Sequence, residues 1–227
     1  MKKRVRWLKI PPVSRAALAK AISGFRRDEF TASSTAGFII ERSSKDFVEA
    51  KFVERFVRTE RNEDPFGTVA ESEKIEYSQT HFVLSTTNNL LEIHDSPRSL
   101  GPALNALSIH MPDISVSPVE TDVVSWLSRI SAEIDSPEIT TALITDVGIS
   151  SSVRAKIGLK GTSGVLLAAE KIMKGKKYSV SKIEVQGTLH GQSCRFQLFE
   201  EGRALVLKGP TEILEFLRES LSEAVSE

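Results

Sequence analysis

Between Val153 and Lys160, apolar residues alternate one by one with arginine, lysine or glycine, in the order VRAKIGLK. A two-residue period places successive side chains on opposite faces of a strand, so this pattern predicts a strand with one buried face and one solvent-exposed, cationic face. Eight lysines and arginines, against the single acid Glu170, lie between Arg154 and Lys182. We therefore expect a basic surface on regular structure, on a sheet of which one face is available to a partner.

The remaining elements follow from the same analysis of periodicity, because helices repeat their apolar residues every three or four positions and strands every two. Capping residues mark helix starts at Ser14, at Asp95-Ser96-Pro97, and at Thr121 or Asp122. The polar segment 59–74, broken by Pro65 and Gly67, predicts an exposed loop. The predicted strands cover residues 4–10, 37–42, 47–58, 75–84, 90–94, 139–147, 153–159, 178–189, 194–199 and 204–207, and further helices begin near residues 163 and 210.

These elements predict an α+β fold made of two similar halves, each an antiparallel sheet covered by helices. The first half, residues 1–111, has the order β-α-β-β-β-β-α, and the second half covers residues 137–227. Residues 112–136 form a linker and a helix between them. The order is similar to that of helix-grip folds and of each half of TATA-binding protein. This resemblance covers topology alone, so it implies no functional residue.

Length and composition are those of an ordinary globular protein. The 227 residues suffice for one large domain or two small ones, and 26% charged with 40% hydrophobic residues argue against disorder. A single cysteine, Cys194, excludes an internal disulfide and a cysteine-rich zinc site, which indicates a reducing compartment. We expect no signal peptide in the basic start of the chain, no membrane-spanning segment and a cytoplasmic location.

Charge is distributed unevenly along the chain although the total is zero. Residues 1–30 carry nine basic and two acidic side chains, residues 31–70 six and seven, residues 71–150 three and twelve, and residues 151–227 twelve and nine. This polarity predicts a cationic face for a polyanion and an anionic face for another partner. The alternative is a folded surface on which both signs are intermixed.

Motifs of common enzymes are absent from the sequence. There is no phosphate loop, and the turn 161–164 (GTSG) has the composition of any tight connection between a strand and a helix. The four histidines, His81, His94, His110 and His190, are too far apart in sequence for a zinc motif. Cys194 lies in a strand pattern and is expected to be a buried small hydrophobe. We expect no cofactor.

One enzyme-like pattern remains at Glu49 and Lys51, which share one face of a predicted strand. Together with Glu41 or Asp46 they resemble the E-x-K half of the motif of restriction-type nucleases. That resemblance implies two acids that hold Mg²⁺ and a lysine that orients the attacking water. No aspartate stands at the expected start of the preceding strand, and an ordinary cross-strand ion pair explains the same residues.

The favoured hypothesis is a non-catalytic binding protein that contacts the backbone of DNA or RNA through a basic surface. Phosphate contacts by a strand with cations about 6–7 Å apart would supply affinity without reading bases. The residues assigned to this surface are Arg4, Arg6, Lys9, Arg26, Arg27, Arg154, Lys156, Lys160, Lys174, Lys176 and Lys177.

Two alternatives belong to other classes of function. A protein-interaction subunit or adaptor of a larger complex would use the acidic region 71–146 and an exposed Phe66 as an anchor. A metal-dependent nuclease would use the Glu49–Lys51 pair.

Overall fold

The computed structural model describes residues 2–63, 65–67 and 69–225, which contain eleven strands and five helices. The chain forms two compact units. Unit 1 consists of residues 1–9 and 117–227, and unit 2 consists of residues 10–116. The predicted α+β class with antiparallel sheets is confirmed. The predicted first half ended at Met111, whereas the first strand belongs in space with the C-terminal part of the chain.

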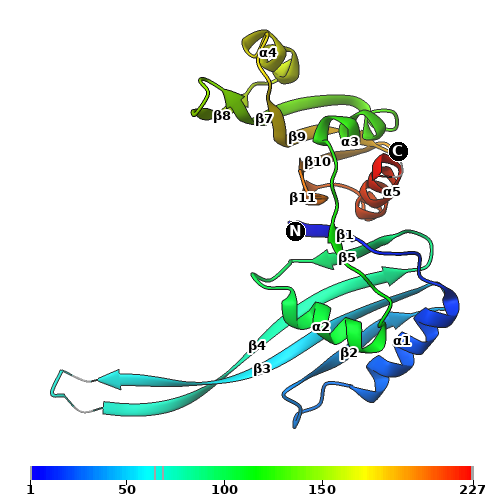
Figure 1. Cartoon of the computed structure of the whole chain (residues 1–227), viewed down its shortest axis with the longest axis vertical. Helices are drawn as coiled ribbons and strands as arrows, with labels where there is room; N and C mark the ends of the chain where they lie inside the picture. The colour runs from blue at the N-terminus through cyan, green and yellow to red at the C-terminus, as the bar shows by residue number, and fades with distance from the viewer. Residues whose placement is uncertain (1, 64, 68, 226–227) are drawn as a thin grey trace. The chain divides into compact units, whose positions relative to one another are not determined.

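Unit 2 is a four-stranded antiparallel sheet with two helices on one face (Figure 1). Its strands lie in the order β2-β3-β4-β5. The elements are α1 (Arg15–Arg27), β2 (Ala36–Ser43), β3 (Phe47–Glu63), β4 (Val69–Ser85), β5 (Leu90–His94) and α2 (Gly101–His110). Together with β1 they reproduce the predicted order β-α-β-β-β-β-α.

Aromatic rings form the core between α1 and this sheet. The ring of Phe25 stacks on Phe38 at 4.3 Å and meets Phe82 edge-on at 5.9 Å, and all three side chains are almost completely buried. Helix α1 begins as predicted, because the Ser14 hydroxyl accepts a hydrogen bond from the Ala17 amide at 3.1 Å. The apolar side chains of α1 are buried against the sheet, so one face of the sheet is covered by helices and, among the described residues of unit 2, the other is not.

Two details of unit 2 differ from the predictions. Helix α2 begins at Gly101 and not at Pro97, because Asp95 adopts a left-handed conformation with φ of 42° and Pro102 occupies the first turn. The predicted loop 59–74 is also wrong, because β3 continues to Glu63 and β4 starts at Val69.

Ion pairs between charged side chains stabilise the parts of β3 and β4 that were predicted as a loop. The side chain of Lys74 lies 3.3 Å from Glu60 and 3.4 Å from Glu76, and Arg58 lies 3.6 Å from Glu76. Beyond Glu54, where β2 stops pairing, this hairpin continues as a ribbon of two strands only. Both of its faces meet solvent, so no alternation of apolar residues marks it in the sequence.

The strands of unit 1 are antiparallel and lie in the order β1-β11-β10-β9-β7-β8, with β6 paired to β1, and β1 follows β5 in the strand order of the chain. The strands are β1 (Lys3–Lys9), β6 (Ser117–Pro118), β7 (Asp135–Gly148), β8 (Arg154–Lys160), β9 (Ser179–Leu189), β10 (Gln192–Phe199) and β11 (Arg203–Lys208). The helices are α3 (Val123–Ile130), α4 (Val165–Ile172) and α5 (Ile213–Val225).

The helices of unit 1 pack on one face of its sheet. Trp7 of β1 meets Trp126 of α3 edge-on at 5.9 Å, and the Trp126 indole donates a hydrogen bond to Ser220 of α5 at 3.0 Å. Helix α4 packs on the same face, where Ala169 and Met173 contact Ile144 and Ile157. Asp122 caps α3 as predicted, since its carboxylate accepts hydrogen bonds from the amides of Val124 and Ser125.

Candidate functional site

The face of the unit 1 sheet opposite α3, α4 and α5, which we call the open face, is strongly cationic. Strand β8 shows how it arises, since Ala155, Ile157 and Leu159 pack under α4 while the alternate residues are exposed. The antiparallel registers carry this alternation across the other strands. The cations of the open face are Arg4, Arg6, Arg154, Lys156, Lys160, Lys182, Arg195 and Arg203, and Glu138 and Glu184 lie among them on the same face.

Some of these cations are neutralised within the protein. Arg195 donates two hydrogen bonds to the buried Glu184, at 2.8 and 2.5 Å, and Arg6 lies 3.7 Å from Glu201. Arg154, Lys156 and Lys160 are exposed and have no carboxylate at ion-pairing distance among residues 2–63, 65–67 and 69–225. Their charge therefore remains available to an external anion.

An aromatic ring lies between the two edges of the open face. The Lys182 ammonium lies 5.4 Å from the centre of the Phe199 ring, and the Arg203 guanidinium carbon lies 5.6 Å from it. Both distances fall within the range of cation–π contacts. This trio was not predicted, because its members come from three strands whose registers are not visible in the sequence.

The two predicted basic stretches of unit 1 share the open face but lie far apart on it, on β1 and on β8. Five strand-to-strand steps separate β1, which carries Arg4 and Arg6, from β8. At about 4.8 Å a step this is about 24 Å. Lys182 and Arg203 lie on strands between them, so the cations form a band across the sheet and not a single cluster.

The other predicted cations have different places. Lys9 is exposed at the end of β1, on the alternate side from Arg4 and Arg6. Arg26 and Arg27 are exposed in the last turn of α1, in unit 2. Lys174, Lys176 and Lys177 follow α4, where all three are exposed. Arg154, Lys176, Lys177 and Tyr178 line a shallow depression of about 570 Å³, with Asp146 and Ser179.

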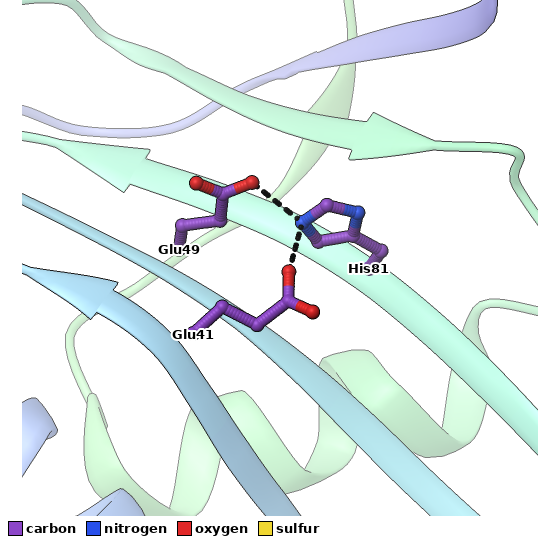
Figure 2. A group of neighbouring side chains, drawn as sticks. All are labelled: Glu41, Glu49 and His81. Carbon is purple, nitrogen blue, oxygen red and sulfur yellow. Dashed lines mark hydrogen bonds and ion pairs between the residues drawn. The ribbon is translucent and has the colours of Figure 1, made fainter.

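A second group of chemically active side chains lies in unit 2, on the face of its sheet away from α1 and α2. Figure 2 shows Glu41 of β2, Glu49 of β3 and His81 of β4 pointing toward one another from three adjacent strands. His81 Nε2 lies 3.0 Å from Glu49 Oε1 and 3.2 Å from Glu41 Oε2. The three potential ligand atoms all lie within 4.8 Å of one another. We call these residues the Glu-Glu-His cluster.

The outer oxygens of both carboxylates have partners of their own. Lys51 donates to Glu41 Oε1, and Arg42 Nε donates to Glu49 Oε2 at 2.6 Å. The predicted pair of Glu49 and Lys51 therefore joins Glu41 in one network. Asp46, the alternative acid, lies elsewhere and accepts a hydrogen bond from Arg15 at 2.6 Å.

Stacking fixes the imidazole of His81. Its ring lies on that of His94, with centres 4.7 Å apart and planes inclined by 26°. His94 Nε2 in turn lies 2.8 Å from the carboxylate of Glu92, which is only 5% exposed. The proximity of His81 to Glu49 was not predicted, because it depends on the register of a long hairpin.

The surroundings lower the pKa values of Glu41, His81 and Glu184, each for a different reason. The hydrogen bond from Lys51 lowers the pKa of Glu41 despite partial burial. Burial lowers the pKa of His81, and neighbouring His94 lowers it further, although Glu41 and Glu49 oppose both effects. In unit 1, burial raises the pKa of Glu184, but hydrogen bonds from Gln197 and Arg195 outweigh it and leave the pKa lowered.

The two-stranded ribbon of β3 and β4 carries the predicted partner anchor. Phe66, between the two strands, is 93% exposed. Phe56, Val57, Ile75 and Tyr77 on the ribbon are also exposed, each by about half. Acidic residues of the predicted region 71–146 lie partly on this ribbon, where Glu76 is paired with Arg58 and Lys74.

Cys194 is buried as predicted, at 1% exposure. Burial raises the pKa of its thiol, which keeps the sulfur protonated and unreactive at neutral pH.

Comparison with protein-family models and with curated proteins finds no match to this chain. Among the described residues, no helix has the length and apolar character needed to cross a membrane.

Proposed function

We propose that this protein binds the sugar-phosphate backbone of nucleic acid, DNA or RNA, through the open face of unit 1, without catalysing a reaction on it. The observation that carries the proposal is the joining of cations from distant stretches of sequence on one sheet face with no helix of unit 1 over it. Arg4 lies on β1, and Arg154, Lys156 and Lys160 lie on the edge strand β8.

The spacing of the cations suits a polyanion. Arg154 and Lys156 are two residues apart on β8, which is about 6–7 Å along the strand and close to the separation of successive phosphates. Lys182 and Arg203 continue the positive charge between β8 and β1. A small inorganic anion would need a compact pocket, whereas a band of this extent fits a chain of phosphates.

Phe199 supports a single-stranded ligand. Proteins that bind single strands combine a cationic track with an aromatic ring on which a base can stack, and such a stack contributes about 1–3 kcal/mol. Phe199 is half-buried and flanked by Lys182 and Arg203, so its ring is held in position among the phosphate-binding groups. Paired bases in a duplex cannot stack on it in this way.

The test is reversal of charge on β8, read by fluorescence anisotropy of a labelled oligothymidine of about 15 nucleotides. Replacement of Arg154, Lys156 and Lys160 by glutamate should abolish binding and leave the melting temperature within about 2 °C, because all three side chains are exposed. The matched control replaces Lys20, Lys45 and Arg98, exposed cations of unit 2, by glutamate. Equal loss of binding in both triple variants would refute a role for the open face, since net charge alone would explain it.

The ribbon of β3 and β4 favours a second candidate function, as a protein-interaction subunit. Its exposed apolar side chains and the 93% exposed Phe66 form a surface on which a partner could anchor. A partner purified with the protein should be released by Phe66→Ala but retained in 0.5 M salt, since apolar contacts resist salt. The control is Ile109→Ala, a change at another exposed apolar residue on α2. Release by salt alone, or equally by both variants, would exclude this anchor.

A further inference from the structure

We propose that Glu41, Glu49 and His81 form a binding site for one divalent transition-metal ion, with Zn²⁺ as the favoured ion. The site belongs to unit 2, so it is separate from the open face and does not rest on nucleic-acid binding. Glu41 Oε2, Glu49 Oε1 and His81 Nε2 supply the three ligand atoms.

Two of the three separations among these atoms match the edges of a coordination polyhedron, and the third, between the two carboxylate oxygens, is at most 4.8 Å. Zinc bonds to imidazole nitrogen and carboxylate oxygen are about 2.0–2.2 Å long, so neighbouring ligand atoms lie about 3.0–3.4 Å apart in octahedral or tetrahedral geometry. His81 Nε2 lies 3.0 Å from Glu49 Oε1 and 3.2 Å from Glu41 Oε2. The imidazole nitrogen therefore already lies at the separation expected for neighbouring ligand atoms from each carboxylate.

A β-bulge places Glu41 in this cluster. The register of β2 against β3 shifts between Ile40 and Arg42, so that Glu41 is the additional residue. Both Glu41 and Arg42 then reach partners on the same face, Lys51 and Glu49 respectively. Bulges of this kind redirect a side chain beside functional sites.

Surrounding groups orient the ligands as the outer partners of metal sites do. Lys51 and Arg42 occupy the oxygens of Glu41 and Glu49 that point away from His81, which leaves the inner oxygens directed at the imidazole. His94 stacks on the His81 ring and is itself held by Glu92. Such outer-shell partners typically change metal affinity by about 10–100-fold.

The donor set determines the class of ion. One imidazole and two carboxylates suit Zn²⁺ and other divalent first-row ions, in the order of affinity that places Zn²⁺ above Mn²⁺. Mg²⁺ and Ca²⁺ prefer all-oxygen sites and gain little from imidazole. On binding, the imidazole proton must reside on Nδ1, so that Nε2 offers its lone pair to the ion.

Calorimetric titration of the metal-free full chain with ZnCl₂ tests this site. We expect saturation at one ion per chain, at least a tenfold loss of affinity for His81→Ala, and no change for His190→Ala. His190 is the matched control, because it also lies near a glutamate, Glu212 at 3.6 Å, but in unit 1. MgCl₂ and CaCl₂ should give no saturable heat below about 1 mM. The absence of one-to-one Zn²⁺ binding, or equal affinity of the His81→Ala variant, would overturn the assignment.

A second variant decides the question if His81→Ala fails to fold. Glu41 is exposed at the sheet surface, so Glu41→Gln removes a charged ligand with little effect on packing. We expect this variant to melt only slightly lower in the absence of metal, because it loses a partly exposed ion pair with Lys51, and to lose most of the upward shift that Zn²⁺ gives the unaltered protein. An undiminished shift in Glu41→Gln would show that Zn²⁺ binds elsewhere.

Discussion

Removing the three cations of β8 should reduce both the affinity for nucleic acid and its dependence on salt by a calculable amount. Arg154, Lys156 and Lys160 are exposed and unpaired among the described residues, so each can displace a counterion from one phosphate. For a single strand, each such contact contributes about 0.7 to the slope of log affinity against log salt. Replacing all three by alanine should therefore lower the magnitude of the slope by about 2.

The same arithmetic gives the loss of affinity. Among the described residues, six cations of the open face have no carboxylate at ion-pairing distance or lie near the Phe199 ring, namely Arg4, Arg154, Lys156, Lys160, Lys182 and Arg203. Together they predict a slope of about −4 for the unaltered protein. At 1 M salt the electrostatic contribution vanishes, so the variant and the unaltered protein should bind about equally. At 0.1 M salt the variant, which lacks three contacts, should bind about 100-fold more weakly than the unaltered protein.

Anisotropy titrations of the oligothymidine at five salt concentrations between about 0.05 and 0.4 M measure both quantities. The alanine triple variant of Lys20, Lys45 and Arg98 is the control, and we expect its slope to equal that of the unaltered protein. A slope near zero for the unaltered protein, or equal slopes for the β8 variant and the unaltered protein, would refute the assignment of phosphate contacts to β8.

Three further predictions concern the folded state. Phe25→Ala should lower the free energy of unfolding in urea by about 3–5 kcal/mol, because it empties a fully buried ring position, whereas Ile109→Ala at an exposed position should change it by less than about 0.5 kcal/mol. Cys194 should react with a thiol reagent only after unfolding, and rapid labelling of the native protein would contradict its burial. Glu184 has a lowered pKa when folded, so its stabilisation is present above its unfolded pKa of about 4.3 and is lost as the pH falls through the lower folded value. Glu184→Gln should thus be less stable than the unaltered protein at pH 7, with a difference that shrinks toward pH 3; a constant difference would exclude this linkage.

Local periodicity carried enough information to predict most of the elements. The alternation at residues 153–159 appears in the structure as the alternating burial of β8, because an edge strand with one packed face exposes every second side chain. The Ser14 and Asp122 caps follow from short-range hydrogen bonding, which depends only on neighbouring residues.

Elements that depend on distant pairing could not be predicted in the same way. The two-stranded ribbon of β3 and β4 is largely polar in sequence between residues 58 and 74, so this stretch resembles a loop, although ion pairs between the two strands hold it extended. Strand β1 pairs with β11, about 200 residues later, and this pairing brings Arg4 to the open face. No local pattern encodes such a register.

The same reason explains the parts of the candidate sites that the sequence left hidden. Glu49 and Lys51 stand out as a pair on one strand, but His81 joins them only through the β3–β4 register and Glu41 only through a bulge. Phe199 becomes notable only once Lys182 and Arg203 lie over its ring. A site whose side chains come from several strands can therefore be identified only once the pairing of those strands is known.

The most direct test of the central claim maps the contact surface by NMR, with the backbone amide signals of the full chain recorded during titration with the oligothymidine. We predict that the largest shifts will fall on β8, β9, β11 and β1, at Lys156, Lys182, Arg203 and Arg4 and their neighbours. Shifts confined to α3, α4 and α5, which cover the other face, or spread over unit 2, would contradict binding at the open face.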